Sequence, residues 1–188
     1  MEDFNNVNSI IKLIAKSKLK AGDSILDATV GNGNDILYLM KIVGEKGFGY
    51  GFDIQELAVN NTKRLLQENG FEDNSKIIHD GHENVGLYVD RQIDFAVFNL
   101  GYLPKADHSI ITRANTTIKS IESIIELLSQ GAMIALASYV GHEGGMEEFL
   151  EVKSFVEALN QKKYNVSMVN FLNQKNKPPK LILIEKRK

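Results

Sequence analysis

The chain has 188 residues and a mass of 21.0 kDa, a length that suits one domain with its own hydrophobic core. It contains no cysteine, which excludes a disulfide scaffold, a thiolate metal site and a cysteine nucleophile. No apolar run approaches the roughly 20 residues that span a bilayer, and the N-terminal residues lack a signal-peptide pattern. We therefore expect a cytoplasmic protein.

The formal net charge of −2 conceals an uneven distribution. Residues 160–188 hold eight basic side chains and one acidic one, a net charge of +7, so the remainder carries −9. A basic end on an acidic body is either a solvated terminus or a contact surface for a polyanion. Charge alone favours the solvated terminus.

The hydrophobic spacing alternates between helical and strand periods along the chain. In the first half it predicts, in chain order, a helix over 6–18, a strand over 24–29, a helix over 34–43, a strand over 47–54, a helix over 56–69, a strand over 76–79, a short helix over 82–89 and a strand over 93–99. After a loop it predicts a helix over 112–129, a strand over 132–138, a helix over 146–160 and strands over 166–172 and 181–186.

Strands that alternate with helices form parallel sheets through right-handed crossovers. The last two predicted strands have only a polar turn between them, so the last strand should be antiparallel. The sequence therefore predicts an α/β fold: a single doubly wound domain over residues 1–188 with a seven-stranded sheet.

The first strand ends in a glycine turn that follows Asp27 and contains Gly31 and Gly33. Asp53 lies twenty residues beyond Gly33, where a carboxylate can hold a ribose diol. A dinucleotide fingerprint would place glycine at Ile36. A carboxylate at Asp27 would also repel a pyrophosphate, whereas it suits the cationic amino end of an amino-acid-like ligand.

This pattern resembles the class I methyltransferases that use S-adenosylmethionine, with a Rossmann-like fold. Asp27, Gly31 and Gly33 match their first motif, although Thr29 replaces its usual first glycine, and Asp53 matches the ribose-binding acid. The resemblance implies that S-adenosyl-L-methionine binds to the following residues: Asp27, Thr29, Gly31, Asn32, Gly33, Asn34, Asp35, Asp53, Ile54, Asp80, Gly81, His82 and Asn99. Asp80 would meet the adenine amino group. The alternative is that these are only turn residues of an α/β fold.

The fourth strand runs into Asn99, followed by Gly101, Tyr102 and Pro104. This segment resembles the Asn-Pro-Pro-Tyr type motif of methyltransferases that act on exocyclic or side-chain nitrogens. The resemblance implies that Asn99 accepts a hydrogen bond from the target nitrogen and that Tyr102 stacks on the substrate. The alternative is a β-turn with a buried tyrosine.

The segments 27–35, 98–104 and 139–148 together resemble a small bacterial family labelled as rRNA methylases. That family includes a tRNA methyltransferase that converts a wobble 5-aminomethyl-(2-thio)uridine to its methylaminomethyl form. The resemblance implies this activity, with the tRNA anticodon region as partner, and it makes an RNA-contacting basic end the favoured interpretation. One departure is Lys105-Ala106, where the family pattern leads us to expect two glycines.

Several alternatives remain open at this point. The substrate could instead be an rRNA base or the amine of a small molecule or protein, or the chain could be a non-catalytic binding module. Asp107, His142 and Glu147 are candidates for accepting the proton of the amine, although capture by Asn99 could suffice. Tyr139 could flank a flipped base. No metal site is expected at His79 and His82. A homodimer is possible.

Overall fold

The computed structural model describes residues 6–101 and 112–188. Its helices are α1 (Val7–Lys18), α2 (Asn34–Val43), α3 (Glu56–Glu68), the 3-10 turn η1 (His82–Asn84), α4 (Val85–Tyr88), α5 (Ala114–Leu127) and α6 (Gly145–Glu157). Its strands are β1 (Ser24–Asp27), β2 (Phe48–Asp53), β3 (Ser75–His79), β4 (Ile93–Leu100), β5 (Leu128–Ser138), β6 (Tyr164–Val169) and β7 (Lys180–Lys186). Among these residues, no helix is long and apolar enough to cross a membrane.

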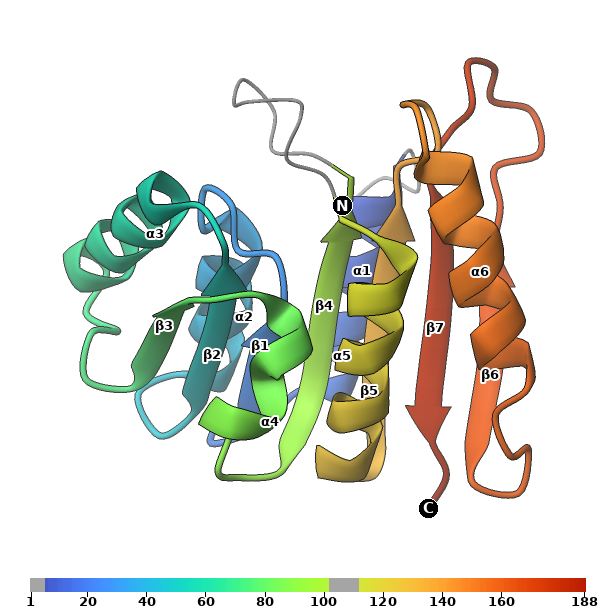
Figure 1. The fold of residues 1–188 in the computed structure, drawn as a ribbon. Helices are drawn as coiled ribbons and strands as arrows, with labels where there is room; N and C mark the ends of the chain where they lie inside the picture. Colours follow the sequence, from blue (N-terminus) through green and yellow to red (C-terminus); the bar gives the residue numbers. More distant parts are fainter. Residues whose placement is uncertain (1–5, 102–111) are drawn as a thin grey trace.

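The strands form one seven-stranded sheet in the order β3-β2-β1-β4-β5-β7-β6 (Figure 1). Strands β1 to β5 pair in parallel, whereas β7 runs antiparallel to both β5 and β6. The predicted α/β fold with an antiparallel last strand is confirmed. Strand order reverses between β1 and β4, and ligands of open α/β sheets bind outside the carboxyl ends of the strands at such a point.

Two hydrophobic layers cover the two faces of the sheet. Helices α1, α2 and α3 supply one layer, and α4, α5 and α6 supply the other. Side chains of β4 alternate between the layers: Phe95 and Val97 face the first, and Ala96 and Phe98 face the second. By the same alternation Asn99 lies on the face of α1 and α2.

Several predicted boundaries were wrong by a few residues. The strand predicted over 166–172 is Tyr164–Val169, because this edge strand exposes most of its side chains and its apolar pattern is weak. The first strand ends at Asp27 because that carboxylate accepts the N–H of Thr29 and starts the turn. The helix predicted from 112 begins at Ala114 because Thr112 bonds Gly101 instead.

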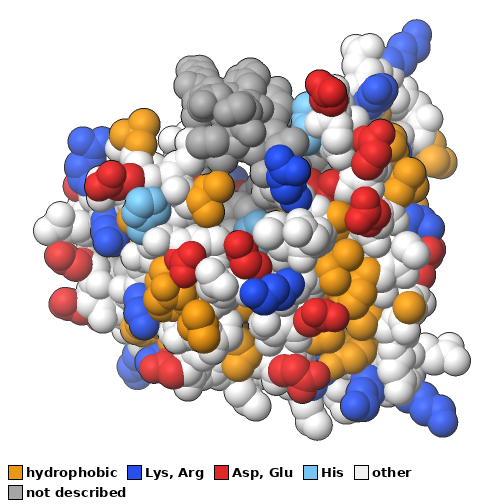
Figure 2. Space-filling view, in the orientation of Figure 1, with side chains coloured by type: hydrophobic (Ala, Val, Ile, Leu, Met, Phe, Trp, Pro, Cys, Tyr) orange, Lys and Arg blue, Asp and Glu red, His pale blue; other side chains and the backbone are white. Residues whose placement is uncertain are grey.

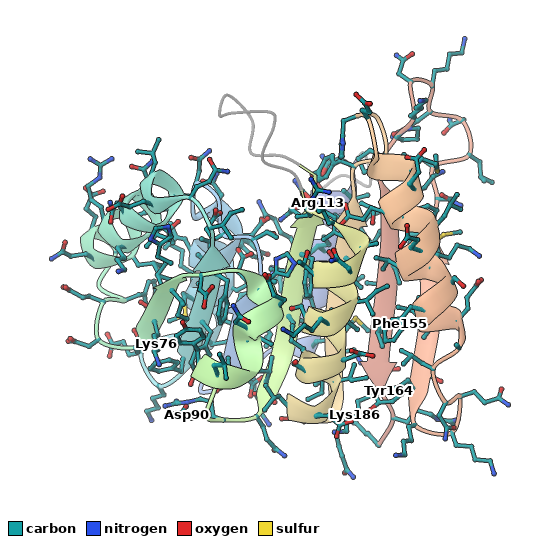
Figure 3. All side chains as sticks on the ribbon, in the orientation of Figure 1. Lys76, Asp90, Arg113, Phe155, Tyr164 and Lys186 are labelled. Atoms are coloured by element: carbon teal, nitrogen blue, oxygen red, sulfur yellow. The ribbon has the colours of Figure 1, made fainter. Side chains whose placement is uncertain are left out.

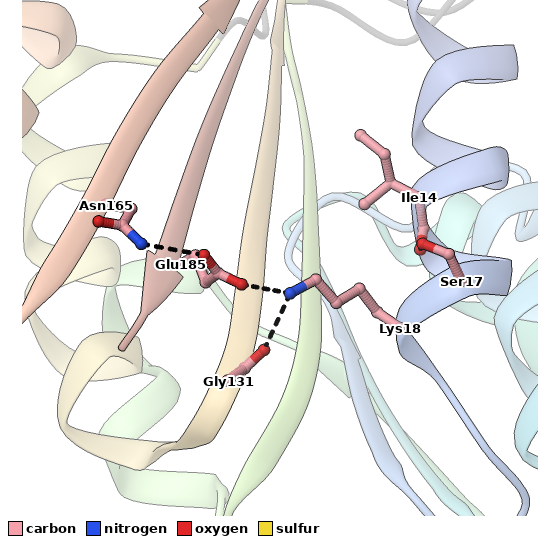
Figure 4. A network of polar contacts seen from close by, with 6 residues as sticks. All are labelled: Ile14, Ser17, Lys18, Gly131, Asn165 and Glu185. Carbon is pink, nitrogen blue, oxygen red and sulfur yellow. Dashed lines mark hydrogen bonds and ion pairs between the residues drawn. The ribbon is translucent and has the colours of Figure 1, made fainter. Parts of the chain in front are cut away.

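Helix α1 is held against the sheet at the edge opposite the carboxyl ends of β1 to β5 (Figure 4). Lys18 forms an ion pair with Glu185 of β7, and its Nζ lies 3.5 Å from the carbonyl oxygen of Gly131. Asn165 of β6 donates to the other oxygen of Glu185 at 3.1 Å. Residues of four elements, α1, β5, β6 and β7, therefore meet at this edge.

Candidate functional site

A cleft of about 1160 Å³ opens at the carboxyl ends of β1 to β4, where the strand order reverses. Its wall includes the following residues that the sequence predicted to bind a cofactor: Thr29, Gly31, Asn32, Asn34, Asp35, Asp53, Ile54, Asp80, Gly81, His82 and Asn99. Asp27 and Gly33, also predicted, are buried behind this wall. Residues far apart in the chain thus meet at one place.

The turn between β1 and α2 needs glycine for two different reasons. Gly31 and Gly33 have φ values of 49° and 78°, which glycine adopts without steric cost. A Cβ on Gly33 would also lie 2.9 Å from Thr62 Oγ1, so packing against α3 requires glycine there. Ile36 is fully buried in the core. The position where a dinucleotide fingerprint has its third glycine therefore serves packing.

Asp53 at the end of β2 holds the glycine turn in place. Its Oδ2 accepts the N–H of Gly31 at 2.9 Å and its Oδ1 accepts the N–H of Gln55 at 2.9 Å. A carboxylate oxygen has two acceptor sites, so each oxygen keeps one for a further donor. A pair of neighbouring hydroxyl groups would match that arrangement.

Asp27 is fully buried at the floor of the turn. Its Oδ1 accepts the N–H of Thr29 at 3.1 Å, whereas its buried Oδ2 has no hydrogen-bond partner among the described residues. Burial and then the negative charge of Asp35 raise the pKa of Asp27 well above its usual value. A cationic group placed nearby would relieve both effects.

The end of β3 contributes Asp80 and His82. Asp80 accepts hydrogen bonds from Gly81 N–H at 2.7 Å, Asn84 Nδ2 at 3.0 Å and the Tyr88 hydroxyl at 2.7 Å. The Tyr88 hydroxyl is the main cause that lowers the pKa of Asp80. One acceptor site therefore remains on the Asp80 oxygen that faces Tyr88.

His82 is the first residue of η1, and its ring packs edge-on against Phe98, with ring centroids 5.7 Å apart. Burial lowers its pKa, so its ring is held in the neutral form at neutral pH. Its Nε2 has no hydrogen-bond partner among the described residues. His82 thus offers an uncharged ring to the cleft.

Two hydrogen bonds hold Asn99 at the end of β4, one from the β1–α2 turn and one from the first turn of α2. Its backbone N–H donates to Thr29 Oγ1 at 2.8 Å, and its Nδ2 donates to Asp35 Oδ2 at 2.9 Å. The hydroxyl of Thr29 thus has a role that the usual glycine of this motif could not supply. Asp35 contacts the predicted catalytic amide.

The predicted catalytic residues differ in what the structure describes. Asn99 and His142 line the same cleft, and His142 Nδ1 lies 2.8 Å from the carbonyl oxygen of Glu143. Tyr139 also lines the cleft, and its hydroxyl donates to Asn8 of α1 at 3.3 Å. Tyr102 and Asp107, together with Lys105-Ala106, lie outside the described residues.

A buried carboxyl group beside the cleft was missed by the sequence analysis. Glu148 in the first turn of α6 accepts from the hydroxyls of Thr112 at 2.7 Å and Thr117 at 2.9 Å. Thr112 Oγ1 in turn accepts the N–H of Gly101 at 2.9 Å, which ties the end of β4 to α5 and α6. A carboxylate three residues after a glycine turn, a threonine before a helix and another within it are too common a pattern to predict this contact.

The charges around the cleft are of opposite sign at its floor and its rim. Asp27 at the end of β1, Asp35 in the first turn of α2 and Asp53 at the end of β2 lie together, close enough for both others to raise the pKa of Asp27. The basic residues that line the cleft are Lys12 and the exposed Lys41, Arg113 and Lys177, which we call its basic rim; Asp80 and Glu83 are further acidic residues of the lining. On the face that Figure 2 shows, by contrast, acidic and basic side chains are interspersed.

The basic C-terminal segment is divided between two edges of the sheet. The turn between β6 and β7 brings Lys177 to the rim of the cleft. Because β7 is antiparallel, it carries the end of the chain to the opposite edge, where Figure 3 labels Tyr164 and Lys186 while Arg113 lies at the cleft edge. The segment with a charge of +7 is therefore not one continuous surface.

Comparison with known proteins gives one family for most of the chain. A family model described as "Putative rRNA methylase" matches residues 50–185. A protein of Arabidopsis thaliana described as "tRNA (mnm(5)s(2)U34)-methyltransferase, chloroplastic" is 35% identical over 160 residues, which cover 80% of this chain and 58% of that protein. The chain thus spans little more than half the length of this relative.

Solved structures are similar over the whole chain. A Clostridium thermocellum protein with the same rRNA-methylase description is 42% identical with a TM-score of 0.95, covering 98% of this chain and 99% of that one. A Streptococcus mutans protein described as a methyltransferase in complex with SAH is 34% identical with a TM-score of 0.88, covering 98% and 99%.

Proposed function

Because the chain belongs to the family described as "Putative rRNA methylase", we propose that it is an S-adenosylmethionine-dependent N-methyltransferase of tRNA. The proposed substrate is the aminomethyl group of the wobble uridine, and the product is its methylaminomethyl form. The observation that carries the proposal is the fixed amide of Asn99, which lies in a cleft with an acidic floor and a basic rim.

The cleft fits the cofactor on the chemistry of its side chains. S-adenosylmethionine supplies a methyl group on a positively charged sulfur. Asp53 has one acceptor site left on each oxygen for the two ribose hydroxyls, and Asp80 has one for the adenine amino group. The buried Asp27 carboxyl, with an oxygen that lacks a partner, suits the cationic amino end of the ligand.

Asn99 acts on the amine that is methylated. A free alkylamine is mostly protonated at neutral pH, and transfer into a cleft away from water favours its neutral form. The Asn99 oxygen accepts an N–H of this amine and so directs the nitrogen lone pair toward the methyl group. As the N–C bond forms, the C–S bond breaks and its electron pair stays on sulfur, and the amine nitrogen then loses one proton.

The released proton needs an acceptor, because an amide oxygen is too weak a base to hold it. His142 lines the cleft and is the candidate among the described residues. Of the other two candidates that the sequence offers, Glu147 is exposed and does not line the cleft, and Asp107 lies outside the described residues. Solvent is the alternative acceptor when the product leaves.

The arrangement of charges supports RNA over a small molecule as substrate. The floor of the cleft suits the cationic reacting groups, whereas the rim cations Lys12, Lys41, Arg113 and Lys177 suit phosphates around them. A target base must leave its stack to reach such a cleft. The Arabidopsis relative is described as acting at position 34 of tRNA, which supports the anticodon as the region bound.

The proposal is tested by nucleoside mass spectrometry of tRNA from cells that lack this protein. We expect the methylaminomethyl-uridine signal to vanish and the aminomethyl precursor to accumulate. A plasmid that encodes the wild-type chain should restore the signal, and one that encodes Asn99→Ala should not. An unchanged methylaminomethyl-uridine level would exclude the proposed substrate.

A second candidate substrate is an rRNA base, which the family description favours. Digestion of rRNA from the same cells distinguishes the two, because a methylated rRNA nucleoside should then disappear while the tRNA nucleosides stay unchanged. A cytoplasmic location remains a prediction, since the Arabidopsis relative is described as chloroplastic. A homodimer is a separate prediction.

A further inference from the structure

The hydrogen bond between Asp35 and Asn99 joins two rigid elements across the cleft. Asp35 lies in the first turn of α2, and Asn99 lies near the end of β4 in the middle of the sheet. The Asn99 Nδ2 and Asp35 Oδ2 atoms are 2.9 Å apart. Both side chains are rooted in regular structure, so the contact sets the direction of the amide.

The chemistry of the two groups determines which end of the amide faces the cleft. An ionised carboxylate only accepts hydrogen bonds, whereas an asparagine amide has one donating and one accepting end. The donating end of Asn99 must therefore face Asp35, which turns Oδ1 away from it. Thr29 Oγ1 holds the backbone N–H of Asn99 at 2.8 Å, so the residue cannot easily swing as a whole.

We propose that Asp35 is a positioning residue that orients the Asn99 amide so that its oxygen faces the substrate amine. The inference rests on the proposed function, because that function assigns Asn99 its acceptor role. It differs from the sequence prediction, which placed Asp35 among the residues that bind the cofactor. Without Asp35 the amide can rotate and present its donating end, which would repel the N–H of the amine.

The first test compares Asp35→Ala with Asp35→Asn in methylation of tRNA that carries the aminomethyl group. Both variants lose the negative charge, but only asparagine keeps an oxygen that can accept from Asn99. We expect kcat of Asp35→Ala to be at least about 10-fold below that of Asp35→Asn, with equal affinities for S-adenosylhomocysteine in calorimetry. Equal kcat values for the two variants would overturn the proposal.

The second test is a double-mutant cycle with Asn99→Ala. If Asp35 acts through Asn99, its removal should cost little further rate once Asn99 is gone. Losses that multiply would show that Asp35 acts on its own. Glu56→Ala is the matched control, because Glu56 is an exposed first-turn carboxylate of α3 outside the cleft, and it should leave turnover unchanged.

A third measurement separates this inference from the proposed function. The Asn99 side-chain NH₂ signal in NMR, assigned by its loss in Asn99→Ala, should be shifted by the carboxylate in the wild type and move in Asp35→Ala. An unmoved signal would overturn the inference whatever the substrate is. If the wild type fails to methylate the tRNA, the proposed function fails and this signal alone decides the role of Asp35.

Discussion

Asp27 is a buried carboxyl group at the centre of the site that lowers the stability of the folded protein when it is charged. It is fully buried, one of its oxygens has no partner among the described residues, and burial together with the charge of Asp35 raises its pKa. An unmatched buried polar group costs about 1–3 kcal/mol. A negative charge on Asp27 therefore lowers the stability of the ligand-free protein and favours the binding of a cationic group.

Asp27→Asn should stabilise the ligand-free protein at neutral pH by about 1–2 kcal/mol, because it removes a buried charge. The folded pKa of Asp27 lies above the unfolded value of about 3.9, so the folded state binds the proton more tightly. The cost is therefore absent below pH 4 and grows as pH rises through the folded pKa.

Urea unfolding of both proteins at pH 4 and pH 7 measures this difference, and the gap should widen at the higher pH. The same substitution should weaken S-adenosylmethionine binding in calorimetry. A variant that is less stable than wild type at pH 7 would contradict this account of Asp27.

Asn99 and Asp53 should separate turnover from cofactor binding. Asn99→Ala should lower kcat about 100-fold while changing S-adenosylmethionine affinity little, because its proposed contact is to the amine. Asp53→Ala should chiefly weaken the binding of the cofactor. It removes the proposed acceptor for the ribose hydroxyls and the carboxylate that holds the N–H of Gly31. Calorimetry and steady-state kinetics measure the two effects, and equal losses of affinity would refute this division.

At the scale of elements, Glu148 joins the end of β4 to α5 and α6. Burial raises the pKa of Glu148, while the hydroxyls of Thr112 and Thr117 lower it. Both hydroxyls donate to the oxygens of this carboxyl group. The position of α6 against α5 therefore depends on the acceptor strength of one buried group.

Thr117→Val keeps the shape of the side chain and removes one of these donors. We expect the free energy of unfolding to fall by about 1–2 kcal/mol at pH 7, because the buried carboxyl of Glu148 loses a hydrogen-bond donor. The hydroxyl favours the ionised form, so the loss should be largest above the folded pKa of Glu148 and shrink as pH falls below it.

Chemical unfolding across pH 4 to 8 measures this dependence. Thr116→Val is the control, because the hydroxyl of Thr116 donates to the carbonyl oxygen of Arg113 at 2.9 Å, an exposed contact away from Glu148. Its loss of stability should be smaller and independent of pH. A pH-independent loss in Thr117→Val would contradict the proposed link to Glu148.

At the scale of the whole molecule, the basic side chains lie at two edges of the sheet. Lys41 of α2 and Lys177 of the β6–β7 turn both line the cleft. Lys162 and Lys163 precede β6 and lie at the opposite edge. Under the proposed function, the first pair lies where the RNA would contact the protein, and the second pair lies away from it.

Reversal of charge at Lys41 and Lys177 should weaken tRNA binding at least about 10-fold and reduce its dependence on salt, because fewer counterions are released. Lys162→Glu with Lys163→Glu changes the total charge equally and should leave both quantities near wild type. Filter binding of tRNA between 50 and 200 mM salt, roughly the range over which phosphate contacts lose most affinity, measures them. Equal losses in the two double variants would show a merely global effect of charge.

The fold and much of the cleft could be predicted from the sequence, since apolar spacing and turn residues are local properties. Periodicity was sufficient for the strands and helices and for the antiparallel last strand, and Asp27, Gly31 and Asp53 follow from their places after strands. Boundaries were less predictable where an edge strand exposes its side chains, as at Tyr164–Val169, because burial depends on neighbours.

Only the tertiary structure showed which groups meet. The contacts of Asn99 with Asp35 and Thr29 span 64 and 70 residues of chain, and that of Thr117 with Glu148 spans 31. Pairing at such separations depends on strand order and helix packing, which no local pattern encodes. The amino-acid sequence thus determined the kind of fold and the composition of its turns, whereas packing decided which carboxylates lie behind the amide and which lysines surround the cleft.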